Sequence, residues 1–266
     1  MRPLVVDWLI ARGLPGWLAP DYVVMGGIAG LVAGFVILRY AKEEERPAYA
    51  LALALAYIGA YAFGTLFELV RSLPAFFAGS GEVALGRAAW GGLLGAVLTA
   101  WIVIRAQRRD ALVFFDRVSV GIGLIFGFVR IGCFLGGCDF GRPSALPWAV
   151  AFPPASLAAE THVQLGWVSS GAASLNVHPT QLYEAGFGFL SAAVMAFLLA
   201  NGVWRGRLAG VWIALYAVFR FGNELLRGDT DRGVYGGLST AQIVSLIVFC
   251  VLSALAWRPR AKEALA

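Results

Sequence analysis

Six ionisable residues lie inside stretches of the chain that are otherwise strongly apolar, and any chemistry is expected to start from them. They are Asp116, Arg117, Arg130, Glu184, Arg220 and Glu224. An ionisable group in such surroundings is costly, so it is usually paired and is a functional candidate by default. Arg220, Glu224 and Arg227 are spaced at i, i+4 and i+7, which predicts that they share one face of a helix.

Arg130 and Arg220 indicate what such a site would bind. A guanidinium group stays charged and holds a phosphate through a bidentate fork. A phosphate within an apolar protein is most simply a phospholipid headgroup. The residues alone therefore predict a pocket for an anionic lipid, and they do not separate an enzyme from a transporter or a binding protein.

The composition supports a membrane setting for these charges. Hydrophobic residues make up 59% of the 266 residues and charged residues only 14%, against roughly 25% charged in soluble domains. The net charge of +5 does not indicate nucleic-acid binding in so apolar a chain. With three Cys and two His, neither a disulfide framework nor an ordinary zinc cage is expected, and no metal or cofactor is predicted.

Seven stretches are long and apolar enough to predict membrane-spanning helices, which need about 20 residues each. They cover about residues 22–39, 48–67, 87–105, 112–136, 181–201, 208–226 and 238–257. The predicted fold is an all-α integral membrane protein, one polytopic domain over residues 1–266, with an arm over about 137–180 between spans four and five. Residues 1–20 are expected at the membrane interface.

Basic residues predict the orientation of these spans. Lys and Arg are more frequent after the first, third, fifth and seventh stretches, as in Arg105, Arg108 and Arg109. The positive-inside rule then places the C-terminus in the cytoplasm and the N-terminus and the arm outside. We therefore expect a multi-pass protein of a cytoplasmic (inner) membrane.

This topology sorts the charged residues by depth. Asp116 and Arg117 fall near an inner end, where a structural ion pair or snorkelling is expected. The other charges fall toward the outer ends of their spans, and two residues at the start of span three fall at the same depth. This predicts one common site near the outer face. Those residues are Glu68, Arg87, Trp90, Arg130, Glu184, Arg220 and Glu224.

Glycines spaced four apart predict close packing between helices. They are Gly26/Gly30/Gly34, Gly91/Gly95, Gly123/Gly127 and Gly132/Gly136. They carry no chemistry of their own.

Four sequence blocks, in order along the chain, resemble the motifs of the prolipoprotein diacylglyceryl transferase family. The first is WGGLLG from Trp90. The second is VRIGCFLGGCDFGR from Val129, followed by PWAVAFP from Pro147. The third and fourth are HPTQLYE from His178 and YAVFRFGNELLR from Tyr216. The resemblance covers roughly residues 86–250.

The resemblance implies transfer of a diacylglyceryl group from phosphatidylglycerol to the lipobox cysteine thiol of a prolipoprotein, the first step of lipoprotein maturation. The implied partners are phosphatidylglycerol, the prolipoprotein signal peptide and the lipid bilayer, with no nucleic acid. Arg130 and Arg220 are expected to contact the headgroup and the leaving group, and Glu224 to hold Arg220 or Arg227. Tyr216 is expected to hydrogen-bond in the same pocket, and Arg142 to contribute to substrate binding.

The chain departs from the family motifs at several polar positions. Trp90 stands where the family has a histidine that is a proposed base, and Cys133, Gly136 and Cys138 replace signature asparagine, asparagine and glutamate. Because Trp cannot accept a proton, His178 or Glu184 would have to serve as base. His178 is alternatively expected to hydrogen-bond the following turn or to cap span five, and His162 to be a loop residue.

Cys133 and Cys138 leave three interpretations open. In a regular helix their side chains would be about 140° apart around the axis and ~7.5 Å apart along it, too far for a disulfide unless Gly136 and Gly137 break the helix. They are a disulfide or redox pair, buried packing thiols, or a substrate-facing thiol that replaces lost chemistry. Cys250 is expected to be a small apolar filler.

Two other functions remain alternatives to the transferase. One is a non-catalytic membrane protein of the same fold that binds an anionic phospholipid, which the replacements at Trp90, Cys133 and Cys138 favour. The other is a membrane thiol-redox protein that uses Cys133 and Cys138. Retention of the buried charges favours the transferase.

Overall fold

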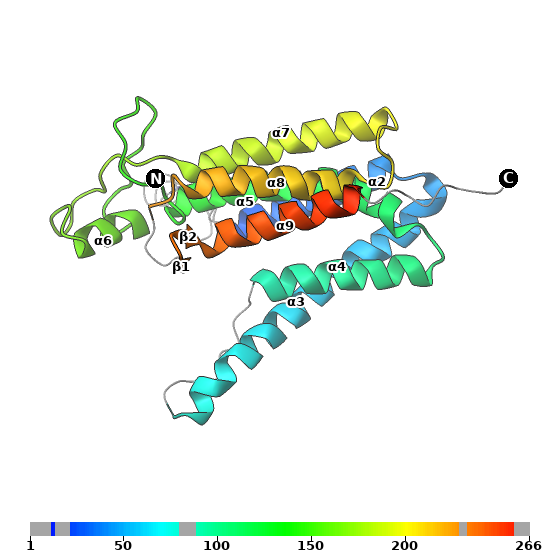
Figure 1. Ribbon diagram of the computed structural model, residues 1–266, viewed down its shortest axis with the longest axis horizontal. Coiled ribbons are helices and arrows are strands. Elements are labelled where there is room, and N and C mark those ends of the chain that lie inside the picture. Colours follow the sequence, from blue (N-terminus) through cyan, green and yellow to red (C-terminus); the bar gives the residue numbers. More distant parts are fainter. Residues whose placement is uncertain (1–11, 14–21, 80–88, 229–232, 258–266) are drawn as a thin grey trace. The chain divides into compact units, whose positions relative to one another are not determined.

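The computed structural model describes residues 12–13, 22–79, 89–228 and 233–257, and these are mostly helical (Figure 1). The helices are α2 (Tyr22–Tyr40), η3 (Glu43–Glu45), α3 (Arg46–Phe77), α4 (Ala89–Ala106), α5 (Ala111–Gly136), α6 (Leu157–Gln164), α7 (Thr180–Ala200), α8 (Leu208–Glu224) and α9 (Thr240–Trp257). A short hairpin pairs β1 (Val234–Tyr235) with β2 (Leu238–Ser239). Each of the seven predicted stretches falls largely on one long helix. The expected interfacial segment 1–20, for all but two residues, and the predicted start of the third stretch lie outside the described residues.

The composition of these helices is that of a membrane protein. Three helical segments are long and apolar enough to cross a membrane by length and composition, namely Glu43–Pro74, Ala111–Gly136 and Thr180–Ala200. Shorter apolar segments are Val24–Tyr40, Gly91–Ala106 and Thr240–Ala254. Large apolar side chains on several helices are exposed, which suits contact with lipid, as at Leu31, Tyr57 and Phe197.

The chain divides into two compact units. One comprises residues 34–118, and the other comprises residues 1–33 and 119–266. The prediction of one polytopic domain stays a prediction beside this division.

In the unit of residues 34–118, α3 and α4 pack closely along their length. A Cβ on Gly95 would lie 2.4 Å from the carbonyl oxygen of Gly59, and a Cβ on Gly91 would lie 2.7 Å from that of Phe63. Both distances are shorter than van der Waals contact, so only glycine allows this approach. The packing predicted for Gly91 and Gly95 is confirmed.

Arg117 belongs to the same unit and has a structural role. Its guanidinium group forms an ion pair with Glu45 at 2.9 Å and donates hydrogen bonds to the Tyr49 hydroxyl and the Tyr40 carbonyl. The predicted structural ion pair is confirmed for Arg117. Glu68, expected at the common site, pairs with Arg71 of its own helix.

The other unit is built on α5, α7, α8 and α9. A Cβ on Gly123 would lie 2.8 Å from the carbonyl oxygen of Gly188, so α5 and α7 are in backbone contact there. Phe187 of α7 stacks on Phe219 of α8 with ring centroids 4.4 Å apart. By contrast, added Cβ atoms on Gly30, Gly34 and Gly136 would meet no atom of the described residues within 4 Å, so these three do not pack closely against the described helices as predicted.

The predicted arm carries helix α6 and forms a small core with the end of α5. Phe134, Phe140, Phe152, Ala158 and Val177 form this core. His162 was expected in a loop, and this is wrong. It lies in α6 with only 1% of its surface exposed. One ring nitrogen of His162 is satisfied in these apolar surroundings, because its Nδ1 accepts a hydrogen bond from the Leu175 amide at 3.1 Å.

Backbone contacts fix the arm against the end of α8. Gly141 pairs with Arg227 in an antiparallel bridge, and the amide of Gly228 donates to the Phe140 carbonyl. A Cβ on Gly141 would lie 2.5 Å from the His178 carbonyl oxygen, so this crossing requires glycine. The crossing brings the ends of α5 and α8 and the start of α7 to one place.

Candidate functional site

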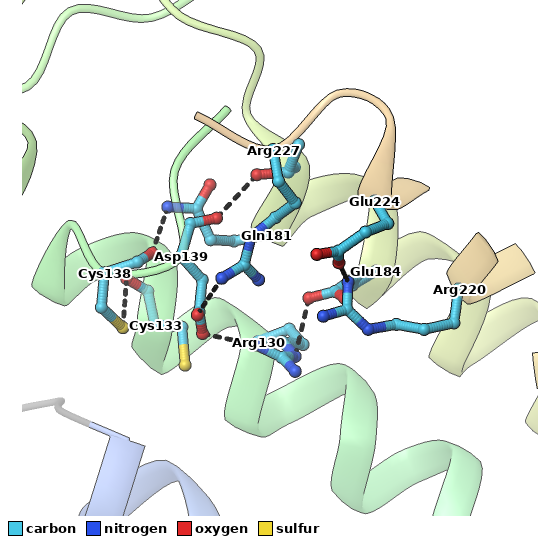
Figure 2. Close-up of polar contacts among 10 residues, drawn as sticks. Arg130, Cys133, Cys138, Asp139, Gln181, Glu184, Arg220, Glu224 and Arg227 are labelled. Atoms are coloured by element: carbon cyan, nitrogen blue, oxygen red, sulfur yellow. Dashed lines mark hydrogen bonds and ion pairs between the residues drawn. The ribbon is translucent and has the colours of Figure 1, made fainter. Parts of the chain in front are cut away.

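Glu184 is the centre of a cluster of charged side chains (Figure 2). Its carboxylate has no exposed surface and lies 2.8 Å from Nε of Arg130 and 3.5 Å from Nη1 of Arg220. Both arginine side chains are themselves more than four-fifths buried. The two guanidinium groups therefore converge on one buried carboxylate.

Helix ends position these three residues. Arg130 lies in the last two turns of α5, Glu184 in the second turn of α7 and Arg220 in the last turns of α8. Arg220 also binds Glu224, one turn further along α8, at 2.6 Å. Residues spaced at i and i+4 are neighbours on a helix, so helix geometry explains this contact.

Asp139 extends the cluster, and sequence reasoning missed it. Its two carboxylate oxygens accept hydrogen bonds of 2.6 Å from Arg130 and from Arg227. Burial raises the pKa of Asp139, but the Arg227 and Arg130 guanidinium groups outweigh it and hold that pKa below its usual range. Asp139 is therefore ionised at neutral pH.

The backbone around Asp139 explains how it reaches the arginines. Helix α5 ends at Gly136, Gly137 has φ +73°, and Asp139 has φ +58°. Asp tolerates this left-handed conformation better than most residues other than Gly. A Gly-Gly pair directly before a Cys-Asp pair was the available signal in the sequence.

These contacts form one alternating chain of charges. It runs from Glu224 through Arg220, Glu184, Arg130 and Asp139 to Arg227. Three arginines face three carboxylates, so the cluster compensates its own charge in a largely buried setting. An anion that enters it can exchange with one of the carboxylates on an arginine.

Two residues of α7 support the Asp139 turn and were also missed. The side-chain amide of Gln181 donates to the Cys138 carbonyl at 2.6 Å, and the Thr180 hydroxyl donates to the Asp139 carbonyl at 2.7 Å. Within the described residues, Oε1 of Gln181 and the whole side-chain amide of Asn223 are buried without a hydrogen-bond partner. Such groups are costly unless a ligand or water satisfies them.

Cys133 and Cys138 lie beside the charged cluster as free thiols. Cys133 is buried, and Sγ of Cys138 lies 3.6 Å from the Cys133 carbonyl oxygen. The break at Gly136 and Gly137 brings one ligand atom each from Cys133, Cys138 and Asp139 within 4.8 Å of one another. A regular helix would keep the two thiols far apart, and the break removes this separation.

The state of the cysteines bears on the redox alternative. The hydrogen bond shared with Cys133 and burial raise the pKa of the Cys138 thiol. A protonated thiol is a poor nucleophile in disulfide exchange. Cys250 is exposed on α9, so its expected role as a packing filler is wrong.

His178 and Tyr216 are placed by other contacts. Nδ1 of His178 lies 3.3 Å from the Tyr183 hydroxyl, which accepts a hydrogen bond from the Trp148 indole. This matches the expectation that His178 bonds the following turn. Tyr216 stacks on Trp212 at 5.4 Å and packs edge-on against Phe126, and its hydrogen bonding in the pocket stays a prediction.

Three predicted site residues remain, namely Arg142, Trp90 and Arg87. Arg142 is exposed on the arm, where its backbone links Leu226 and His178. Trp90 is the second residue of α4 and belongs to the other unit, so its predicted contribution stays a prediction. Arg87 lies outside the described residues.

Comparison with known proteins gives a consistent family assignment. Residues 21–258 match the family model described as "Prolipoprotein diacylglyceryl transferase". A protein of Clostridium tetani named phosphatidylglycerol–prolipoprotein diacylglyceryl transferase is 32% identical over 61% of this chain and 59% of its own length. Proteins of the same name from Nitratidesulfovibrio vulgaris and Finegoldia magna are 36% and 27% identical, over 60% and 82% of this chain and 56% and 83% of their own lengths. The chain thus spans less than two thirds of the first of these relatives.

Proposed function

Since this chain belongs to the prolipoprotein diacylglyceryl transferase family, we propose that it transfers a diacylglyceryl group from phosphatidylglycerol to a prolipoprotein cysteine. The similar proteins carry names that describe this pair of substrates. One observation carries the proposal for this chain. Arg130 and Arg220, each within a block that resembles a family motif, converge on buried Glu184.

The charged cluster supports a role in phosphate binding and departure. When the bond between the glyceryl carbon and the phosphate oxygen breaks, negative charge develops on the leaving glycerol phosphate. Preorganised donors aimed at such charge are among the largest contributions to catalysis. Arg130 and Arg220 would supply these donors, with Glu184 and Glu224 fixing their orientation. Tyr216, Arg142 and Arg227 remain proposed substrate contacts.

The acceptor side of the reaction has fewer candidates. Trp90 replaces the family's proposed base, and each carboxylate oxygen of Glu184 already forms an ion pair with an arginine, Oε2 with Arg130 and Oε1 with Arg220. His178 contacts the Tyr183 hydroxyl through Nδ1, and we propose it as the base candidate on the acceptor side. A cysteine acceptor is already a few per cent thiolate near neutral pH, so slow turnover does not require a base.

The membrane arrangement is part of the proposal. Seven spans over the predicted stretches would place the cluster near the outer face of a bacterial inner membrane, with the N-terminus outside and the C-terminus in the cytoplasm. Phosphatidylglycerol would reach the cluster from the bilayer, and the prolipoprotein signal peptide would present the acceptor cysteine there. The apolar helices and the basic loops support this arrangement.

The experiment combines purified protein, phosphatidylglycerol vesicles and a lipobox peptide with one cysteine. Mass spectrometry would detect a diacylglyceryl thioether on the peptide, and no product with the matched serine peptide. Arg71→Lys is the control variant, because Arg71 is exposed and forms its ion pair with Glu68 of the same helix. Vesicle binding without any product would favour the non-catalytic lipid-binding alternative, for which the replacement at Trp90 is the specific observation.

A further inference from the structure

Cys133, Cys138 and Asp139 form a second cluster, on the side of Asp139 away from Glu184 (Figure 2). Two thiols and one carboxylate oxygen lie within 4.8 Å of one another. Cys133 is buried, and Cys138 and Asp139 are partly buried. The charged cluster accounts for the contacts of Asp139 with arginine, but it does not account for two thiols gathered at the same carboxylate.

The spacing is close to what a tetrahedral metal ion requires. With Zn–S bonds of about 2.3 Å, two thiolate ligands lie roughly 3.8 Å apart. The three atoms would therefore shift by about 1 Å or less to enclose Zn²⁺. Cys138 lies two residues beyond the end of α5 and both sulfurs are on rotatable side chains, so this shift needs no movement of α5.

The arginines around Asp139 are compatible with such a site. A carboxylate offers about four lone pairs, and only one hydrogen bond per oxygen is used by Arg130 and Arg227. Two thiolates and one carboxylate with Zn²⁺ carry a net charge of −1, which the neighbouring guanidinium groups offset. Hydrogen bonds to a ligating carboxylate are also the usual support of a metal site.

We propose that Cys133, Cys138 and Asp139 bind a thiophilic divalent cation, Zn²⁺ in the first instance, and leave its fourth position open for the acceptor thiol. This deepens the proposed transferase function and rests on it. The sequence predicted no metal because a closed cage needs four ligands, whereas an open site needs three. The residues that replace the family's signature asparagine and glutamate are the two thiol ligands.

The chemistry of this site supplies what Trp90 cannot. A thiol bound to such a cation is deprotonated, with its proton released to water. Its sulfur then forms a C–S bond with the glyceryl carbon. The C–O bond to the phosphate breaks, and the electron pair leaves on glycerol phosphate beside Arg130. No oxidation state changes, and no further reactant is needed.

The first test is metal binding by the purified, reduced protein in detergent, without lipid or peptide. Co²⁺ serves as a spectroscopic substitute for Zn²⁺. We expect one Co²⁺ per chain with thiolate-to-metal charge-transfer absorption. Cys133→Ser and Cys138→Ser should each weaken binding at least about 10-fold, while the matched control Cys250→Ser should not change it, because Cys250 is exposed on α9. Absence of this absorption, or its persistence in both serine variants, would overturn the site.

A second readout tests the open position without using activity. Addition of the single-cysteine peptide to the Co²⁺-loaded protein should change the Co²⁺ spectrum, and the serine peptide should leave it unchanged. An unchanged spectrum with both peptides would overturn the acceptor role. Metal binding and a peptide response without thioether product would support this site and count against the transferase. Product formation that Zn²⁺ and chelator leave unaltered would support the transferase and overturn the acceptor role.

Discussion

Glu184→Gln is the sharpest test of the charged cluster, because it removes one charge and hardly changes shape. Removal of one partner from a buried ion pair costs about 3–5 kcal/mol of unfolding free energy. Glu184 serves two arginines, but Arg130 keeps Asp139 at 2.6 Å and Arg220 keeps Glu224 at 2.6 Å. We therefore expect a loss at the lower end of that range, about 3 kcal/mol.

The measurement is denaturant unfolding of the protein in detergent micelles. Glu68→Gln is the matched control, since its pair with exposed Arg71 should contribute nothing measurable. Combining Glu184→Gln with Arg220→Met restores the charge balance, so the double variant should be more stable than the two single losses predict by about 1 kcal/mol or more. If Glu184→Gln is as stable as the unsubstituted protein, Glu184 does not compensate the two arginines and the reasoning fails.

Four further predictions concern rate, pH and topology. Arg220→Lys should lower the rate of thioether formation by about 10²–10³, because a point charge replaces a bidentate donor; an unchanged rate would exclude bidentate contact. Trp90→His should raise that rate by about 10²-fold or more if the missing base limits turnover, and an unchanged rate would count against that explanation. Burial lowers the pKa of His162 below its usual value near 6.5, so the neutral form stabilises the arm above that pH and the stabilisation is lost as pH falls through the lower pKa. Hydrogen exchange at the Leu175 amide should accelerate over that acidic range, and a flat profile would contradict the sign. In a variant whose Cys133, Cys138 and Cys250 are replaced by serine, a cysteine introduced by Ala264→Cys should resist an impermeant thiol reagent added outside intact cells, and labelling would contradict the predicted orientation.

Parts of the cluster could be predicted from the sequence because helix geometry and hydropathy act locally. Apolar stretches fixed where helices form, and charges toward their ends identified Arg130, Glu184 and Arg220 together. The spacing of Arg220 and Glu224 predicted their contact, because residues four apart are neighbours on a helix. In each case the signal lies within about one turn of the residue concerned.

The missed parts depend on backbone geometry outside the helices. Asp139 reaches Arg130 and Arg227 because α5 ends at Gly136 and because Gly137 and Asp139 adopt left-handed conformations. The same break brings Cys133 and Cys138 together. The prediction of a loop at His162 is wrong for a related reason. A single short helix in the arm buries this residue against aromatic rings, and a backbone amide donates to its Nδ1. Hydropathy alone predicts neither arrangement, and the Gly-Gly pair before Cys138 and Asp139 indicates only that the helix can break there.

The signs of the charges follow from which ends of the helices meet. The carbonyl end of a helix carries partial negative charge and the amide end partial positive charge. Arg130 lies near the carbonyl end of α5 and Arg220 near that of α8, whereas Glu184 lies near the amide end of α7. Each side chain thus has the sign that its own helix end favours, and opposite signs meet because α7 runs against its neighbours. Two carboxylates go against this rule, Asp139 just beyond the carbonyl end of α5 and Glu224 at that of α8, and both lie against arginines. Asp139 has Arg130 and Arg227 at 2.6 Å, and Glu224 has Arg220 at 2.6 Å. With 32% of its side chain exposed, against none for Glu184, Asp139 is the carboxylate that an incoming anion or cation would affect first.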